Sequence, residues 1–199
     1  FPQLPAFGLM LLFTAFTVYA AINYNSQIIA ILGLVGAYAV PFLLSTGSGR
    51  VDILFSYIAI INIGILFVSL QKYWKPVYYS AFAMTWLIYA GWHIADYSEK
   101  THFTLALVFL AIFYLIFYAT FIGYKMKHQK SLGFSDVVMI LLNSFLFYGL
   151  GYYIIAENQQ TEHLVGAFTL INAVIHFAVS TAIYKLKLAD KSIFYMLSG

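Results

Sequence analysis

The chain has 199 residues, of which 63% are hydrophobic and only 9% are charged, and its formal net charge is +3. An ordinary soluble domain carries about 25% charged residues, so this composition excludes a water-soluble fold. Cysteine is absent, which excludes disulfides, thiolate metal sites and cysteine nucleophiles.

The predicted elements follow from the length of the apolar stretches. A helix of about 20 apolar residues crosses the bilayer core, and lipid satisfies no backbone hydrogen bonds. The sequence therefore predicts an all-α fold, a polytopic transmembrane helix bundle that forms one domain over residues 1–199. We expect it to be a fragment of a longer multi-pass protein. The seven predicted helices cover roughly residues 4–23, 27–44, 52–70, 76–94, 103–124, 135–156 and 163–186.

The second predicted helix contains small residues and an internal proline. Gly33 and Gly36 carry no side chain, so they allow a neighbouring helix to approach closely. Pro41 removes one backbone hydrogen bond and predicts a kink about one turn before the helix ends. Two interpretations stay open here: a tightly packed, kinked helix, or a broken helix that lines a substrate site as in transporters.

The stretch NYNSQIIAILGLVGAYAVPFLLSTGSGR, which ends at Arg50, resembles a large bacterial membrane-protein family named domain of unknown function 2339. Ala37 stands where the family pattern has a second glycine, so packing there is expected to be slightly relaxed. The specific resemblance covers residues 24–92, where Tyr57, Asn62 and Trp74 fit the continuation. It implies a bacterial inner-membrane protein, part of a long chain with many membrane helices and no assigned activity. The matching residues are Tyr24, Ser26, Gln27, Ala30, Gly33, Gly36, Pro41, Leu43, Leu44, Ser45, Thr46 and Gly47.

The charged residues divide between alternate loops. Eight of the ten basic residues follow the third, fifth and seventh predicted helices, whereas five of the seven acidic residues lie in the other loops. Lysine-rich loops face the cytoplasm. We therefore expect the loops with Lys72, Lys125 and Lys185 to be cytoplasmic.

Four polar residues lie deep inside predicted helices: Asn62, Asn143, Asn172 and His176. Polar groups are costly in a membrane, so each needs an explanation. They either form hydrogen bonds that fix helix packing or bind a solute or proton along a polar pathway. The aromatic stretch FYLIFYATF, residues 113–121, is a further candidate for a ligand wall, although aromatic residues are common in membrane helices.

Histidine and acidic residues gather on the side opposite the lysine-rich loops. Carboxylate and imidazole groups can act as acid and base or bind a divalent metal. Their spacing is not diagnostic and also suits ordinary loop residues, so we expect no metal and no cofactor. The catalytic candidates are His93, Asp96 and His163, with Glu99, His102, Glu157 and Glu162 nearby in sequence.

Three functional hypotheses stay open for this multi-pass protein. The first is a transport or envelope-related role, with Asn62, Asn143, Asn172 and His176 as substrate-binding residues. The second is a membrane-embedded enzyme that acts on a lipid-linked or periplasmic substrate. The third is a non-catalytic scaffold. In each case the expected partner is the lipid bilayer, together with other membrane proteins or the remaining helices of the full-length chain, and not nucleic acid.

Overall fold

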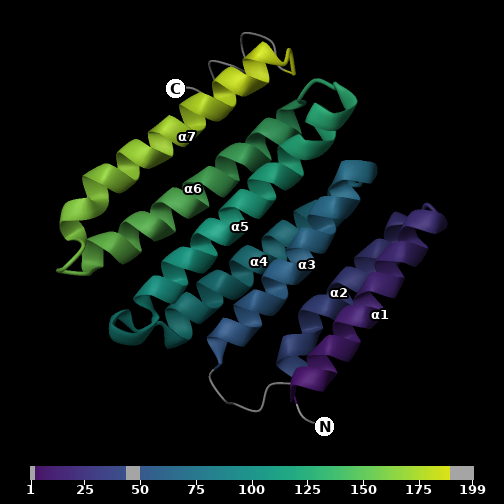
Figure 1. The fold of residues 1–199 in the computed structure, drawn as a ribbon, viewed down its shortest axis with the longest axis horizontal. Coiled ribbons are helices and arrows are strands. Elements are labelled where there is room, and N and C mark those ends of the chain that lie inside the picture. Colours follow the sequence, from purple (N-terminus) through teal and green to yellow (C-terminus); the bar gives the residue numbers. More distant parts are fainter. Residues whose placement is uncertain (1–2, 44–49, 189–199) are drawn as a thin grey trace. The chain divides into compact units, whose positions relative to one another are not determined.

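The fold is all-helical, as predicted, in a computed structural model that describes residues 3–43 and 50–188 (Figure 1). These residues contain no strand. The extents of the predicted membrane helices and the single domain over residues 1–199 stay predictions. The elements are α1 (Gln3–Asn23), α2 (Gln27–Leu43), α3 (Val51–Gln71), α4 (Lys75–Asp96), α5 (Glu99–His128), α6 (Phe134–Glu157), the 3-10 helix η1 (Glu162–Leu164) and α7 (Val165–Lys185).

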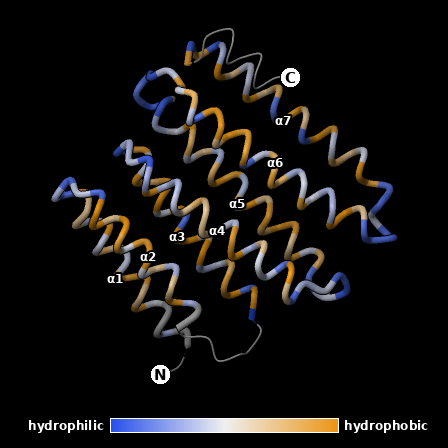
Figure 2. The backbone as a smooth tube through the Cα atoms, turned by 180° about the vertical axis from the view of Figure 1, so that it is seen from behind, coloured by the Kyte–Doolittle hydropathy of each residue, from blue (hydrophilic) through white to orange (hydrophobic). Residues whose placement is uncertain are grey.

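Four helical segments within the described residues are long and apolar enough to cross a membrane: α3, α5, α6 and the run Glu162–Lys185. Figure 2 shows apolar residues along the helices and hydrophilic residues mainly near their ends. α1 and α2 contain shorter apolar stretches, Gly8–Asn23 and Gln27–Pro41. α4 is not among the four. It is rich in tyrosine and tryptophan, whose large apolar rings also carry a polar group.

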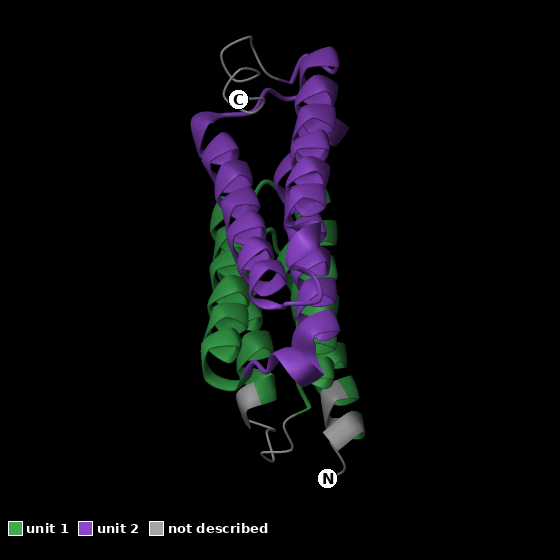
Figure 3. Cartoon of the chain, turned by 90° about the vertical axis from the view of Figure 1, so that its left-hand side faces the viewer, with its two compact units in different colours: residues 1–96 green, residues 97–199 purple. Residues whose placement is uncertain are grey.

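The chain divides into two compact units, residues 1–96 and residues 97–199 (Figure 3). In unit 1, α1 packs on α2, and α2 packs on both α3 and α4. An aromatic cluster holds α3 against α4: Phe55 stacks on Tyr89 with ring centroids 5.4 Å apart and meets Trp92 edge-on at 5.0 Å. The helices are thus joined by ring contacts that also contribute large buried areas.

A close approach joins α1 to α2 at Gly33. A Cβ added there would overlap Thr17 Cγ2, and the Thr17 hydroxyl is fixed by a 2.9 Å hydrogen bond to the Phe13 carbonyl. Gly36 differs, because a Cβ there would meet no atom within 4 Å. The turn between the two helices contains Asn25, which has a positive φ of 49° and whose Oδ1 accepts a 2.8 Å hydrogen bond from Lys72.

Unit 2 is built on the α5–α6 pair, with α7 packed on α6. The Tyr114 and Phe147 rings stack with centroids 4.2 Å apart across α5 and α6. Gly151 allows the ring of Phe168 from α7 to approach α6, because a Cβ on Gly151 would collide with that ring.

A buried ion pair closes the α5–α6 hairpin. Lys125 Nζ lies 3.4 Å from Asp136 Oδ2, and these side chains are only 10% and 3% exposed. Each charge has a further partner, since Lys125 donates to the Ser131 carbonyl at 2.9 Å and Asp136 accepts from the Gly133 N–H at 2.8 Å. Asp136 therefore both neutralises a buried lysine and satisfies a backbone donor at the start of α6.

Gly33→Ala should lower the free energy of unfolding by about 1–3 kcal/mol, because the added carbon pushes α2 away from Thr17. Gly36→Ala is the matched control, and it should be neutral or stabilising, since alanine favours a helix by about 1 kcal/mol over glycine. Thermal unfolding in detergent micelles measures both. Equal effects of the two substitutions would contradict a close helix approach at Gly33.

Asp136→Ala should lower the free energy of unfolding by about 3–5 kcal/mol, because it leaves Lys125 buried and uncompensated. The exposed pair Arg50–Asp52, joined at 2.8 Å with side chains 60% and 50% exposed, supplies the control. Asp52→Ala should change stability by less than about 1 kcal/mol. Denaturant titration in mixed micelles compares the two variants. A small effect of Asp136→Ala would show that the ion pair does not stabilise the α5–α6 hairpin.

Candidate functional site

Three polar side chains meet inside unit 1, one each from α2, α3 and α4. Tyr38 donates to Asn62 Oδ1 at 2.6 Å, and Asn62 Nδ2 donates to Thr85 Oγ1 at 2.9 Å. Thr85 donates in turn to the Ala81 carbonyl at 2.8 Å. Both ends of the Asn62 amide thus have partners within the protein, which is the arrangement of a helix-linking contact. The assignment of Asn62 to a solute site is an untested prediction, and these contacts favour the packing interpretation instead.

A second polar centre lies in unit 2, around Asn143 of α6. This side chain is fully buried, and its Nδ2 donates to the Tyr114 carbonyl of α5 at 3.0 Å. Its Oδ1 is also buried but has no hydrogen-bond partner. Exchanging the amide's nitrogen and oxygen would place an oxygen against the Tyr114 carbonyl, so this orientation is the favourable one. Asn143 therefore presents an unsatisfied acceptor inside the bundle.

Ring contacts extend this centre to α7. The Tyr114 and Tyr118 rings meet edge-on with centroids 5.2 Å apart, and Tyr118 meets His176 at 6.1 Å. Asn172 lies one turn before His176 on the same helix face, and its buried Oδ1 also has no hydrogen-bond partner. We call Tyr114, Tyr118, Asn143, Asn172 and His176 the polar cluster. The sequence pointed to three of them, and the two tyrosines fall in the aromatic stretch of residues 113–121.

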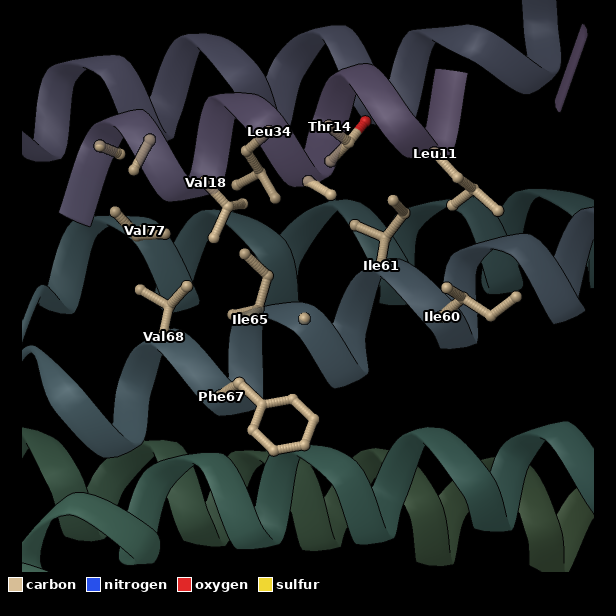
Figure 4. Close-up of a pocket in the computed structure, with 14 residues that line it drawn as sticks. Leu11, Thr14, Val18, Leu34, Ile60, Ile61, Ile65, Phe67, Val68 and Val77 are labelled. Atoms are coloured by element: carbon tan, nitrogen blue, oxygen red, sulfur yellow. The ribbon is translucent and has the colours of Figure 1, made fainter. Parts of the chain in front are cut away.

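An apolar pocket of about 300 Å³ opens in unit 1 (Figure 4). Gly64 contributes to this space, because a Cβ added to it would meet no atom within 4 Å. No charged side chain lines the pocket, and the Thr14 hydroxyl is engaged with the Met10 carbonyl at 2.8 Å. The lining therefore suits apolar groups only. It includes Leu11 and Val18 of α1, Leu34 of α2, and Ile61, Ile65 and Val68 of α3.

The catalytic candidates are divided between the two units. His93 and Asp96 lie at the end of α4 in unit 1, where the His93 ring stacks beside Tyr89 with centroids 6.5 Å apart. His163 is exposed in η1 of unit 2. Within the part of the chain that the structure describes, no three histidine or acidic residues are grouped so that they could hold a metal ion. The catalytic role of these residues stays a prediction.

Two other groups at this end of unit 2, His102 and Tyr97, have defined surroundings. The Ser98 N–H donates to His102 Nδ1 at 3.2 Å at the start of α5. Burial raises the pKa of the Tyr97 hydroxyl above its ordinary value, and the negative charges of Glu99 and Glu157 raise it further. Glu99 of α5 and Glu157 of α6 therefore both act on Tyr97.

A family described as "Predicted membrane protein (DUF2339)" matches residues 1–196 of the chain. The chain belongs to this family. The match confirms the resemblance and extends it well beyond the N-terminal motif. No curated protein and no solved structure matches the chain.

One part of the DUF2339 motif has a clear structural explanation. Pro41 lies inside α2, which continues to Leu43, and proline has no N–H for the Ala37 carbonyl four residues earlier. The buried Tyr57 hydroxyl of α3 donates to that carbonyl at 3.1 Å. Tyr57 thus replaces the hydrogen bond that Pro41 removes. The motif residues Leu44, Ser45, Thr46 and Gly47 lie outside the described residues.

Tyr57→Phe should lower the free energy of unfolding by about 1–3 kcal/mol, because the Ala37 carbonyl loses its partner in a buried site. Pro41→Ala should reduce that loss, since an alanine N–H can bond the same carbonyl. A double-mutant cycle measured by denaturant titration tests this coupling. Strictly additive effects of the two substitutions would show that Tyr57 does not replace the missing bond.

Proposed function

We propose that this member of the DUF2339 family is a transport segment of a multi-pass bacterial inner-membrane protein. The polar cluster of unit 2 is the place where a small polar solute or a proton binds. We also propose that the ends bearing Lys72, Lys125 and Lys185 face the cytoplasm, on the basis of the positive-inside rule.

The observation that carries the proposal is the unsatisfied oxygen of Asn143. Its side chain is 0% exposed, and its Oδ1 lacks a partner. A buried polar group without a hydrogen bond costs about 1–3 kcal/mol, so an acceptor of this kind needs a compensating role. A solute that donates a hydrogen bond would recover that energy on binding.

The surrounding cluster supports the same interpretation. Asn172 adds a second unsatisfied carbonyl oxygen, and His176 adds an imidazole that can exchange protons. His176 is only partly buried, so the cluster extends from the core of unit 2 towards its surface. Asn62 of unit 1 provides the contrast, because its amide has partners at both ends.

Single cysteines test the proposal directly, since the chain has no cysteine of its own. We would place them at Asn143, Asn172 and His176 in a full-length protein that lacks other cysteines, and measure modification by a small water-soluble thiol reagent. Asn62 is the matched buried control, and Lys127 and Glu162 are the accessible controls.

Transport predicts modification at the three cluster positions and protection at Asn62, because water must reach the solute site. Reaction at Lys127 and Glu162 alone would contradict the proposal. The cluster would then be a packing contact, as expected of a scaffold. Modification at Asn62 to the same extent would also count against it, because access would not be specific to the cluster.

A further inference from the structure

One end of unit 2 carries exposed lysines that no described acidic side chain pairs with. Lys127 comes from the last turn of α5 and Lys130 from the following loop, whereas Lys185 ends α7 and Lys187 lies in the turn after it. Asp136, the acidic residue described at this end, is engaged with buried Lys125. Asp190 and Lys191 follow in the sequence and cancel in charge. We call Lys127, Lys130, Lys185 and Lys187 the basic end.

The lysines belong to one surface because the α5–α6 connection and the segment after α7 are joined by a backbone hydrogen bond. The Leu132 N–H donates to the Leu188 carbonyl at 2.7 Å. Both leucine side chains are buried, with exposed fractions of 4% and 1%. The α5–α6 connection and the end of α7 therefore meet at the same end of the unit (Figure 1).

Exposed apolar and aromatic side chains accompany this positive charge. Phe134 is 76% exposed, Met126 is 43% exposed and Leu186 is 39% exposed. Lys130 Nζ lies over the Tyr124 ring, 5.6 Å from its centroid. Lysines interleaved with apolar side chains and an aromatic ring are typical of the boundary between lipid tails and headgroups.

The length of α5 places this surface at headgroup depth. α5 has 30 residues, and at a rise of about 1.5 Å per residue it is about 45 Å long. A bilayer is about 40–45 Å thick when its headgroup regions are included. The last turn of α5 therefore reaches the headgroup layer when the rest of the helix crosses the core.

We infer that the basic end binds the headgroups of anionic phospholipids in the adjoining leaflet. The lysines supply attraction to the phosphates, and the exposed Phe134 and Leu186 enter the acyl boundary beneath them. A soluble phosphate would use the lysines but not the apolar side chains. The inference is independent of the proposed function, because none of these lysines belongs to the polar cluster.

The test measures which lipids the full-length protein retains after extraction from an equal mixture of phosphatidylglycerol and phosphatidylcholine. We expect selective retention of phosphatidylglycerol, which falls as ionic strength rises. Replacing all four lysines of the basic end with glutamine should reduce that retention by about tenfold or more. The matched control replaces the same four lysines with arginine, which preserves the charge and should preserve retention. Lys100→Gln, at the start of α5, should also leave it unchanged.

Equal retention of the two lipids by the unaltered protein would overturn the inference. So would unchanged phosphatidylglycerol retention in the glutamine variant. At constant ionic strength, complete displacement of phosphatidylglycerol by inorganic phosphate would show that the surface recognises a free anion and not a lipid. Lipid retention at increasing ionic strength is measured on the unaltered protein. The inference can therefore fail even if the glutamine variant does not fold.

Discussion

The structure depends on one constraint: inside a bilayer, a polar group must find its partner within the protein, because lipid tails offer none. Helices satisfy their own backbones, and Pro41 is the point where α2 cannot do so. The Tyr57 hydroxyl reaches across from α3 to the Ala37 carbonyl that Pro41 leaves without a donor. A residue that would weaken an isolated helix is in this way turned into a connection between two helices.

Two buried asparagines, one in each unit, meet this constraint to different degrees. In unit 1, Tyr38, Asn62 and Thr85 saturate one another and link three helices. In unit 2, Asn143 bonds the Tyr114 carbonyl with its nitrogen and leaves its oxygen unmatched. Two asparagines that look alike in the sequence thus have different environments, and the incompletely satisfied one is the better candidate for a ligand.

Much of the fold could be predicted from the sequence, because apolar length alone specifies helices in a membrane protein. The same property prevents the contacts between helices from being predicted. Helices that are apolar on all sides carry little information about which face meets a neighbour. Asn62 could therefore be singled out, but not its partners Tyr38 and Thr85. The pairing of Lys125 with Asp136 was not predicted either, because the sequence does not show which charges the hairpin brings together.

The Lys125–Asp136 pair has a consequence for how the chain enters the membrane. Neither charge is easily buried without the other, and the two lie close in sequence on either side of one short loop. A hairpin that forms early presents them to the bilayer as a neutral pair. We therefore expect α5 and α6 to insert together, as a single hairpin.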